Sequence, residues 1–306
     1  MNPLKSSILT AALALVTLTS ANAQIYINEI FFNPGGTDAP NEFIELRGTP
    51  SLTVSTGTYL LFLEGDNGGS STVGARPGDI QGIFDLSGKA FGANGYMALR
   101  QFGSSYSVNS SATSYTATST GWGGLGLNSA TAGGDVENIS FTAMVISIGT
   151  AAAPTWGQQL DSDNNGLLEL VSGWSILDSI GVGDTGVSDR LYGAVNFSNA
   201  PEGSSVSSNN GLLKYLGWSE TEYLARVADS TGNTLADWAV ADTGFVSPDT
   251  AVASTVNTDE SWNLAAGVAI AGTLGSVNPV PEPSSAALLG FGTLALLGLR
   301  RLNRKS

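Results

Sequence analysis

The sequence contains no cysteine and no histidine in 306 residues. Without these residues there can be no Ser-His-Asp or Cys-His nucleophile, no zinc site of imidazole or thiolate ligands, and no His- or Cys-ligated haem. Disulfide bonds are excluded too, so stability must come from packing or from bound ions. Paired carboxylates remain as a catalytic device, but among 26 Asp and Glu residues close pairs arise by chance. We therefore expect a protein that is not an enzyme and has no catalytic residues.

Basic residues are also few, with 12 Lys and Arg against 26 Asp and Glu. Five of the basic residues lie near the two ends of the chain, which leaves residues 24–279 with 7 basic and 25 acidic residues. A body with so much negative charge repels phosphate backbones, and we expect no nucleic-acid partner. An acidic surface is suited to binding cations or to keeping a protein soluble.

The N-terminus has the three parts of a secretory signal peptide. Lys5 supplies the positive start, residues 8–18 form an uncharged and mostly apolar run, and Ala21-Asn22-Ala23 gives a small-x-small cleavage pattern. The apolar run is far shorter than the roughly 20 residues that a membrane span needs. We predict export through the Sec machinery and removal of residues 1–23 by signal peptidase, between Ala23 and Gln24.

Residues 280–306 also have three parts in a fixed order. They are Val280-Pro281-Glu282-Pro283, an uncharged apolar run that ends at Leu299, and a basic cluster of Arg300, Arg301, Arg304 and Lys305. Residues 284–299 would cover about 24 Å as a helix, less than the roughly 30 Å of a bilayer core. The basic cluster should stay in the cytoplasm by the positive-inside rule. This pattern predicts a short C-terminal transmembrane anchor, with the body outside the cytoplasmic membrane.

This C-terminal order resembles the PEP-CTERM sorting signal of Gram-negative bacteria. The resemblance implies that an exosortase-type membrane enzyme cuts near Pro281-Glu282-Pro283 and then releases or re-attaches the protein, much as a GPI signal is processed. It implies transient anchoring, then a place at the cell surface or outside the cell. It also implies an association with exopolysaccharide and biofilm. Val280, the Pro-Glu-Pro residues, Arg300 and Arg301 would then serve sorting and processing.

The body between the two ends has the local signals of β structure. Short runs rich in β-branched and aromatic residues are bounded by Gly, Asn, Asp or Ser. These runs are residues 25–32, 43–46, 59–63, 82–86, 96–102, 139–148, 175–182 and 191–197. One helix is expected, because Ser219 to Glu222 form a capping box before residues 223–227. With no repeat of fixed period, a solenoid is not expected. We predict an all-β fold, an antiparallel β-sandwich with long loops and at least one short helix.

The start of the body resembles a lamin-tail domain, an immunoglobulin-like sandwich. The resemblance rests on Ile27-Asn28-Glu29-Ile30, Asn33-Pro34 and Glu42-Phe43-Ile44-Glu45-Leu46. It implies a binding or structural module that is not itself an enzyme. Because residues 24–279 are about twice the length of such a domain, the body is either one domain with insertions or two. Residues 104–134 and 198–210 are the candidate seams.

Residues 161–169 match the first part of an EF-hand-type calcium loop. Oxygen-bearing side chains stand at positions 1, 3, 5 and 9, and glycine at position 6: Asp161, Asp163, Asn165, Glu169 and Gly166. Ca²⁺ prefers six to eight hard oxygen ligands, and glycine permits the sharp turn. Position 12 is Ser172 instead of Glu, so Asp178 or Asp184 would have to supply the missing carboxylate. Two interpretations stay open here: an empty polar turn, and a structural Ca²⁺ site with Asp161, Asp163, Asn165 and Glu169 as ligands.

Six tryptophans could serve either the core or a ligand: Trp122, Trp156, Trp174, Trp218, Trp238 and Trp262. Exposed in a row, they would bind polysaccharide; buried, they would fill the core of a protein without disulfides. Our leading hypothesis is an exported, non-enzymatic protein of the cell surface or extracellular matrix. The alternatives are a carbohydrate-binding or adhesive module and, less favoured, a secreted hydrolase that uses carboxylates.

Overall fold

The computed structural model describes residues 24–34, 38–126, 134–138, 140–216, 221–241, 243–244, 252–253 and 274–278. The predicted signal peptide, the sorting segment 280–306, Trp218 and Trp262 lie outside these ranges. Regular structure in the described part is β, apart from one 3-10 helix at Leu235–Asp237. The predicted all-β class is therefore confirmed.

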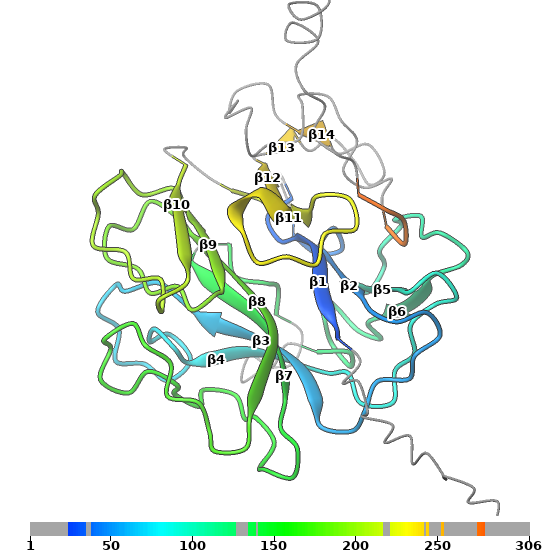
Figure 1. Ribbon diagram of the computed structural model, residues 1–306, viewed down its shortest axis with the longest axis horizontal. Coiled ribbons are helices and arrows are strands. Elements are labelled where there is room, and N and C mark those ends of the chain that lie inside the picture. The colour runs from blue at the N-terminus through cyan, green and yellow to red at the C-terminus, as the bar shows by residue number, and fades with distance from the viewer. Residues whose placement is uncertain are drawn as a thin grey trace, which may run out of the picture.

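Twelve strands form two six-stranded sheets, which lie on the right and on the left of Figure 1. The first has the order β12 (Trp238–Ala241), β11 (Tyr223–Arg226), β1 (Tyr26–Phe31), β2 (Phe43–Arg47), β5 (Tyr96–Arg100), β6 (Thr113–Thr116). The second has the order β10 (Leu212–Tyr215), β9 (Val195–Ser198), β8 (Ser175–Gly183), β7 (Phe141–Ser147), β3 (Thr58–Glu64), β4 (Ile80–Asp85). A short pair joins β13 (Thr243–Gly244) to β14 (Val252–Ala253).

Both sheets are mixed, which corrects the predicted antiparallel sandwich. β5 pairs with β6 in parallel, and β8, β9 and β10 are parallel neighbours. Their register places Ile180 beside Val195 and Val195 beside Leu212. The chain thus winds round and returns in the same direction with each strand, as in a β-solenoid. The three strands share this winding without sharing a sequence pattern, so the sequence has no repeat of fixed period that would indicate a solenoid.

One apolar core joins the inward faces of the two sheets. Phe32 packs edge-on against Phe141 with ring centroids 4.8 Å apart, and Phe84 meets Trp122 at 5.1 Å. Smaller buried clusters cover part of each outward face. Strands such as β3 and β7 are therefore buried almost throughout, and their sequences are continuous apolar runs with no alternation.

The eight predicted strand runs coincide with β1 to β5 and β7 to β9, whereas the predicted helix is wrong. Residues 223–226 form β11, which pairs with β1 on one side and β12 on the other. All four side chains are buried, so the tertiary pairing outweighs the local capping signal. The described part of the Ser and Thr-rich stretch 104–134 contributes the edge strand β6 and the buried residues Tyr106, Ala117 and Trp122.

The described tryptophans do not form an exposed row. Trp122, Trp174 and Trp238 are buried, and Trp156 is half-buried. The described tryptophans therefore serve mainly to pack the core. This is the role that a protein without disulfides needs.

Candidate functional site

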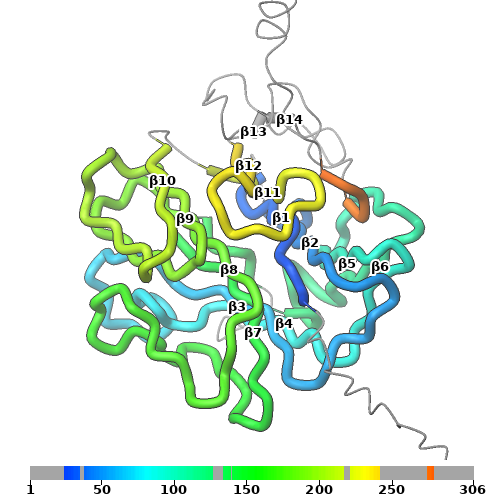
Figure 2. The backbone as a smooth tube through the Cα atoms, in the orientation of Figure 1, coloured from blue at the N-terminus to red at the C-terminus, as the bar shows by residue number. Residues whose placement is uncertain are grey.

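Residues 274–278 lie against the outer face of the first sheet, drawn in orange in Figure 2. The Leu274 side chain is buried among aromatic residues of that face. Five hydrogen bonds hold the segment: Asn109 N to the Leu274 carbonyl (3.0 Å), Asn94 Nδ2 to the Gly275 carbonyl (2.7 Å), Asn109 Nδ2 to Ser276 Oγ (3.0 Å), Asn278 Nδ2 to the Asn28 carbonyl (3.3 Å) and Gly275 N to Glu45 Oε2. The body therefore binds the residues that lead directly into the predicted sorting segment.

Two fully buried carboxylates lie on this face, Glu29 of β1 and Glu45 of β2. They are paired across the strands, and a β-bulge at Asn28 puts an extra residue beside them. Asn28 Nδ2 donates to Glu45 Oε1 at 2.6 Å, and the Gly275 amide donates to Glu45 Oε2. Burial, and then the charge of Glu29, raise the pKa of Glu45 well above its ordinary value. The segment 274–278 thus closes over two acidic groups.

Substituting Gly275 by alanine should detach the segment. Gly275 has a φ of +78°, and a Cβ there would lie 2.6 Å from Ala112 Cβ and 3.0 Å from Asn109 Cβ. The left-handed conformation alone costs about 1–2 kcal/mol for a residue with a Cβ, and the contact adds to it. We expect faster hydrogen exchange over residues 274–278 in Gly275→Ala. Gly203→Ala is the control, because Gly203 has a similar φ of +86° and open space around it. Equal effects of the two substitutions would contradict the tight fit.

The predicted calcium-loop residues do lie in one turn, but each of the four side chains accepts a hydrogen bond from within the chain. Asp161 is buried and accepts hydrogen bonds from Gly166 N (2.9 Å) and from the Tyr192 hydroxyl (2.8 Å). Asp163 accepts from Asn165 Nδ2 at 2.9 Å. The Asn165 oxygen accepts from Leu167 N, and Glu169 accepts from Ser162. The geometry is that of a polar turn closed on itself, and calcium binding here stays a prediction.

Neither proposed source of a further carboxylate points to this turn. Asp178 forms a buried ion pair with Arg226 at 2.8 Å, and the Asp184 carboxylate accepts from Gly186 N at 2.6 Å. Within the described ranges, no three Asp or Glu side chains are grouped closely enough to hold a metal ion by themselves. Any cation site in this part of the chain would therefore have to use amide or carbonyl oxygens as well.

Two other carboxylates with raised pKa values lie near a small cavity of about 150 Å³, whose lining includes Glu137 and the Trp156 ring. Gln81 Nε2 donates to Glu64 Oε2 at 2.6 Å, and Gln81 also bonds to Glu137. Burial raises the pKa of Glu64 to about 8 and that of Glu137 to a lesser extent. Among the described sites, this cavity most resembles the acidic cleft of a hydrolase. It is nevertheless too small to hold three consecutive sugar units.

A third acidic group lies between β7 and the loop that precedes β9. Ser140 Oγ donates to Asp189, and Asp184 N donates to Ser140 Oγ at 3.0 Å. Burial is the main cause that raises the pKa of Asp189 to about 7, although the hydrogen bond from Ser140 opposes it. Asp189 is therefore a buried carboxyl group that joins this loop to the start of β7.

The stability of the folded chain should rise as the pH is lowered from 8 to 5. In the folded state Glu64 and Asp189 keep their protons up to a pH of about 8 and about 7, whereas the unfolded chain loses them near 4.5 and 3.8. The folded state thus binds more protons than the unfolded chain in this window. Each group therefore raises the free energy of unfolding by at most about 1.4 kcal/mol for each pH unit of acidification, before solvent screening. Urea unfolding at several pH values tests this. Glu64→Gln should flatten the slope, and Asp163→Asn should leave it unchanged.

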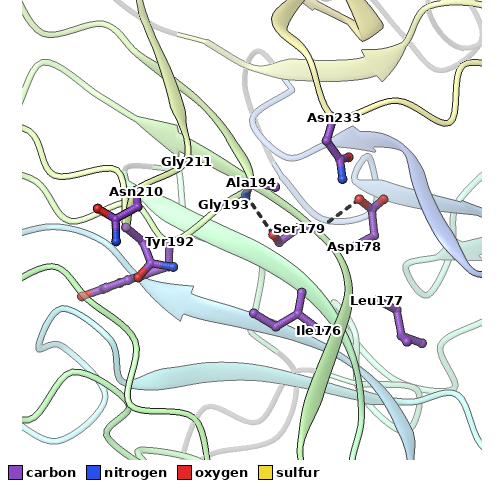
Figure 3. Close-up of a pocket in the computed structure, with 11 residues that line it drawn as sticks. Ile176, Leu177, Asp178, Ser179, Tyr192, Gly193, Ala194, Asn210, Gly211 and Asn233 are labelled. Carbon is purple, nitrogen blue, oxygen red and sulfur yellow. Dashed lines mark hydrogen bonds between the residues drawn. The ribbon is translucent and has the colours of Figure 1, made fainter.

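The hollow in Figure 3 has a volume of about 420 Å³ and lies beside β8. Backbone groups and short polar side chains line it, including Ser179, Asn210 and Asn233. Ser179 Oγ accepts a hydrogen bond from Ala194 N at 2.9 Å, and the Asp178 carboxylate is already paired with Arg226. The hollow therefore contains no activated nucleophile or free base.

Sequence reasoning missed the residues that organise these sites, above all Gly275 and Asn278. Nothing in their local sequence marks them, because their partners Glu45 and Asn28 lie near the other end of the chain.

The apolar run of the predicted signal peptide, residues 8–18, and the predicted C-terminal anchor, residues 284–299, lie outside the described ranges. Among the residues that are described, no helix has the length and apolar character to cross a membrane.

Comparison with known proteins gives one match. No curated protein and no solved structure matches the chain, so the lamin-tail resemblance stays a prediction. Residues 279–305 match the PEP-CTERM protein-sorting motif, which confirms the sorting segment expected at residues 280–306. The chain therefore carries a PEP-CTERM sorting motif directly after the docked segment 274–278.

Proposed function

We propose that the protein is an exported, non-enzymatic component of the cell surface or extracellular matrix, processed by an exosortase-type enzyme at its C-terminus. The match of residues 279–305 to the PEP-CTERM sorting motif carries this proposal. The signal peptide predicted at residues 1–23 provides the export step that must come first. A Gram-negative-type envelope is the setting in which both signals are used.

The docked segment supports a division of the chain into a folded body and a separable address. Asn278, the last described residue, is 2% exposed and bonded to β1, and the matched motif begins at the next position. A cut near Pro281 to Pro283 would leave every hydrogen bond of residues 274–278 in place. Processing would therefore remove the address without disturbing the body.

The non-enzymatic part of the proposal is supported by how the carboxylates are used. The buried acidic groups of the described chain are engaged in hydrogen bonds or ion pairs that tie strands and loops together, as Asp178 and Asp161 are. This use of the carboxylates agrees with a binding or structural role in the matrix. Exopolysaccharide is the partner that we propose.

Fractionation of an exporting host tests this function. The wild-type chain should appear at the cell surface or in the medium, and Glu282→Ala should remain with the membrane because the processing motif is altered. Glu202→Ala is a matched control, since Glu202 is an exposed glutamate of the body. The same distribution for the wild type and Glu282→Ala would contradict the proposed role of the motif.

A further inference from the structure

Buried polar oxygens are gathered under residues 274–278. Glu29 and Glu45 are both fully buried and lie opposite each other in the β1–β2 register. The side-chain oxygens of Asn28 and Asn278, residues that are 0% and 2% exposed, have no hydrogen-bond partner. Buried amide oxygens without a donor are rare in folded proteins and call for an explanation, such as an ion.

These groups belong to one place. Asn28 Nδ2 bonds to Glu45 Oε1 at 2.6 Å, and Asn278 Nδ2 bonds to the Asn28 carbonyl at 3.3 Å. The bulge between Ile27 and Glu29 puts Asn28 next to the carboxylate pair instead of in the regular ladder. Because the two groups of an amide share one carbon atom, the oxygen of Asn28 lies close to Glu45, and the oxygen of Asn278 lies close to the backbone of Asn28.

We propose that Glu29, Glu45 and the amide oxygens of Asn28 and Asn278 bind a calcium ion, which ties residues 274–278 to the first sheet. The inference does not depend on the sorting function.

The charge balance favours a divalent cation. Two like charges directly opposite each other on a sheet are destabilising, and burial increases the repulsion. The nearest positive side chain, Arg47, donates to the Ser230 carbonyl at 2.5 Å and faces Asp229 at 3.6 Å, so its charge is shared. One divalent ion neutralises both carboxylates. A proton on one carboxyl would relieve the repulsion, but it supplies a single donor and would leave at least one of the two amide oxygens without a partner.

The ligand chemistry favours calcium over other cations. The candidate ligands are carboxylate and amide oxygens, which suit Ca²⁺, whereas zinc prefers nitrogen or sulfur. Mg²⁺ keeps several waters and demands octahedral geometry, which a site closed by the docked segment does not favour. The hydrogen bonds to Glu45 are compatible with a bound ion, because each carboxylate oxygen has two lone pairs. Extracellular modules bind Ca²⁺ with a Kd on the order of 10⁻⁴–10⁻³ M, and we expect this range.

Calcium and terbium titrations of the full chain test the site. Calorimetry at pH 7.5 should show binding of calcium. Tb³⁺ luminescence excited through tyrosine should rise and then fall when calcium is added, because Tyr96 lines the adjoining hollow together with Gly275. Glu45→Gln keeps the shape of the side chain and should abolish both signals. Asn278→Ala should weaken binding by at least about tenfold, the loss that even an outer-shell change produces.

Asp163→Asn is the matched control, because it removes a carboxylate from the turn of residues 161–169 and should leave the Glu45-dependent signals unchanged. Asn278 lies outside the sheets, so we expect Asn278→Ala to fold. This variant therefore still tests the site if Glu45→Gln fails to fold. The proposal is overturned if no calcium binds, if Asn278→Ala binds as the wild type does, or if Asp163→Asn is the variant that abolishes binding.

Discussion

Asp178→Ala is expected to lower the free energy of unfolding by about 3–5 kcal/mol, the usual cost of removing one partner of a buried ion pair. Asp178 of β8 and Arg226 of β11 have side chains that are 1% and 0% exposed, and they belong to different sheets. The guanidinium donates to both carboxylate oxygens, at 2.9 and 2.8 Å. The pair is therefore a polar link between the two sheets.

The surroundings of Arg226 explain why its charge would be left without compensation. It also donates to the carbonyls of Ile27 (2.9 Å) and Gly232 (2.6 Å), and it lies 4.4 Å from the centroid of the Trp238 ring. Asp178 in turn accepts from Ile27 N at 2.8 Å. Without the carboxylate, a buried positive charge keeps its carbonyl and aromatic contacts but loses its counter-ion.

Chemical unfolding of the full chain measures the effect. Asp229→Asn is the control, because Asp229 faces Arg47 at 3.6 Å and its side chain is 56% exposed, so the cost should be below about 1 kcal/mol. The double variant Asp178→Leu with Arg226→Met should recover much of the stability lost in Asp178→Ala, since no isolated charge remains. A loss for Asp178→Ala as small as that of the control would refute the link.

Trp122→Ala should also cost about 3–5 kcal/mol, the range for removal of a large buried aromatic side chain. Trp122 is 0% exposed and packs edge-on against Phe84. Its indole Nε1 donates to Glu42 Oε2 at 2.7 Å. Alanine would leave a cavity between the sheets and take a donor from a buried carboxyl whose pKa is raised well above its ordinary value, mainly by burial.

Two further variants separate the cavity from the hydrogen bond. Trp122→Phe keeps most of the ring and loses only the donor, and we expect a cost of about 1–3 kcal/mol. Trp156→Ala should cost less than Trp122→Ala, because Trp156 is half-buried at the margin of the fold. If thermal or urea unfolding ranked Trp156→Ala as the more damaging change, Trp122 would not be the core residue that the structure shows.

The strands were predictable where the signal is local. Runs such as Leu60 to Leu63 are apolar, rich in strand formers and bounded by turn residues. Local composition is therefore enough to predict β3 and similar strands. The direction of β9 was not predictable, because parallel neighbours depend on how the chain returns, and no repeat marks the return from Val195 to Leu212. β11 was mistaken for a helix because a local cap is weaker than burial between β1 and β12.

The candidate sites likewise include local features, which the sequence indicates, and long-range contacts, which it does not. The turn at Asp161 is a local feature, since its hydrogen bonds from Asn165 and Gly166 span only a few residues, and its composition could be recognised in the sequence. The bond between Gly275 and Glu45 joins residues 230 positions apart. No single-sequence pattern indicates that contact, although Glu45 was singled out as part of the lamin-tail resemblance.

The mass of the C-terminal peptide of the exported protein tests the central claim most directly. The full chain would be expressed in a host that has an exosortase-type enzyme, recovered from the surface or the medium, digested and examined by mass spectrometry. We predict a C-terminus at or near Pro281 to Pro283, with the residues after the cut absent. Exported protein that still ends at Ser306 would contradict processing at the motif.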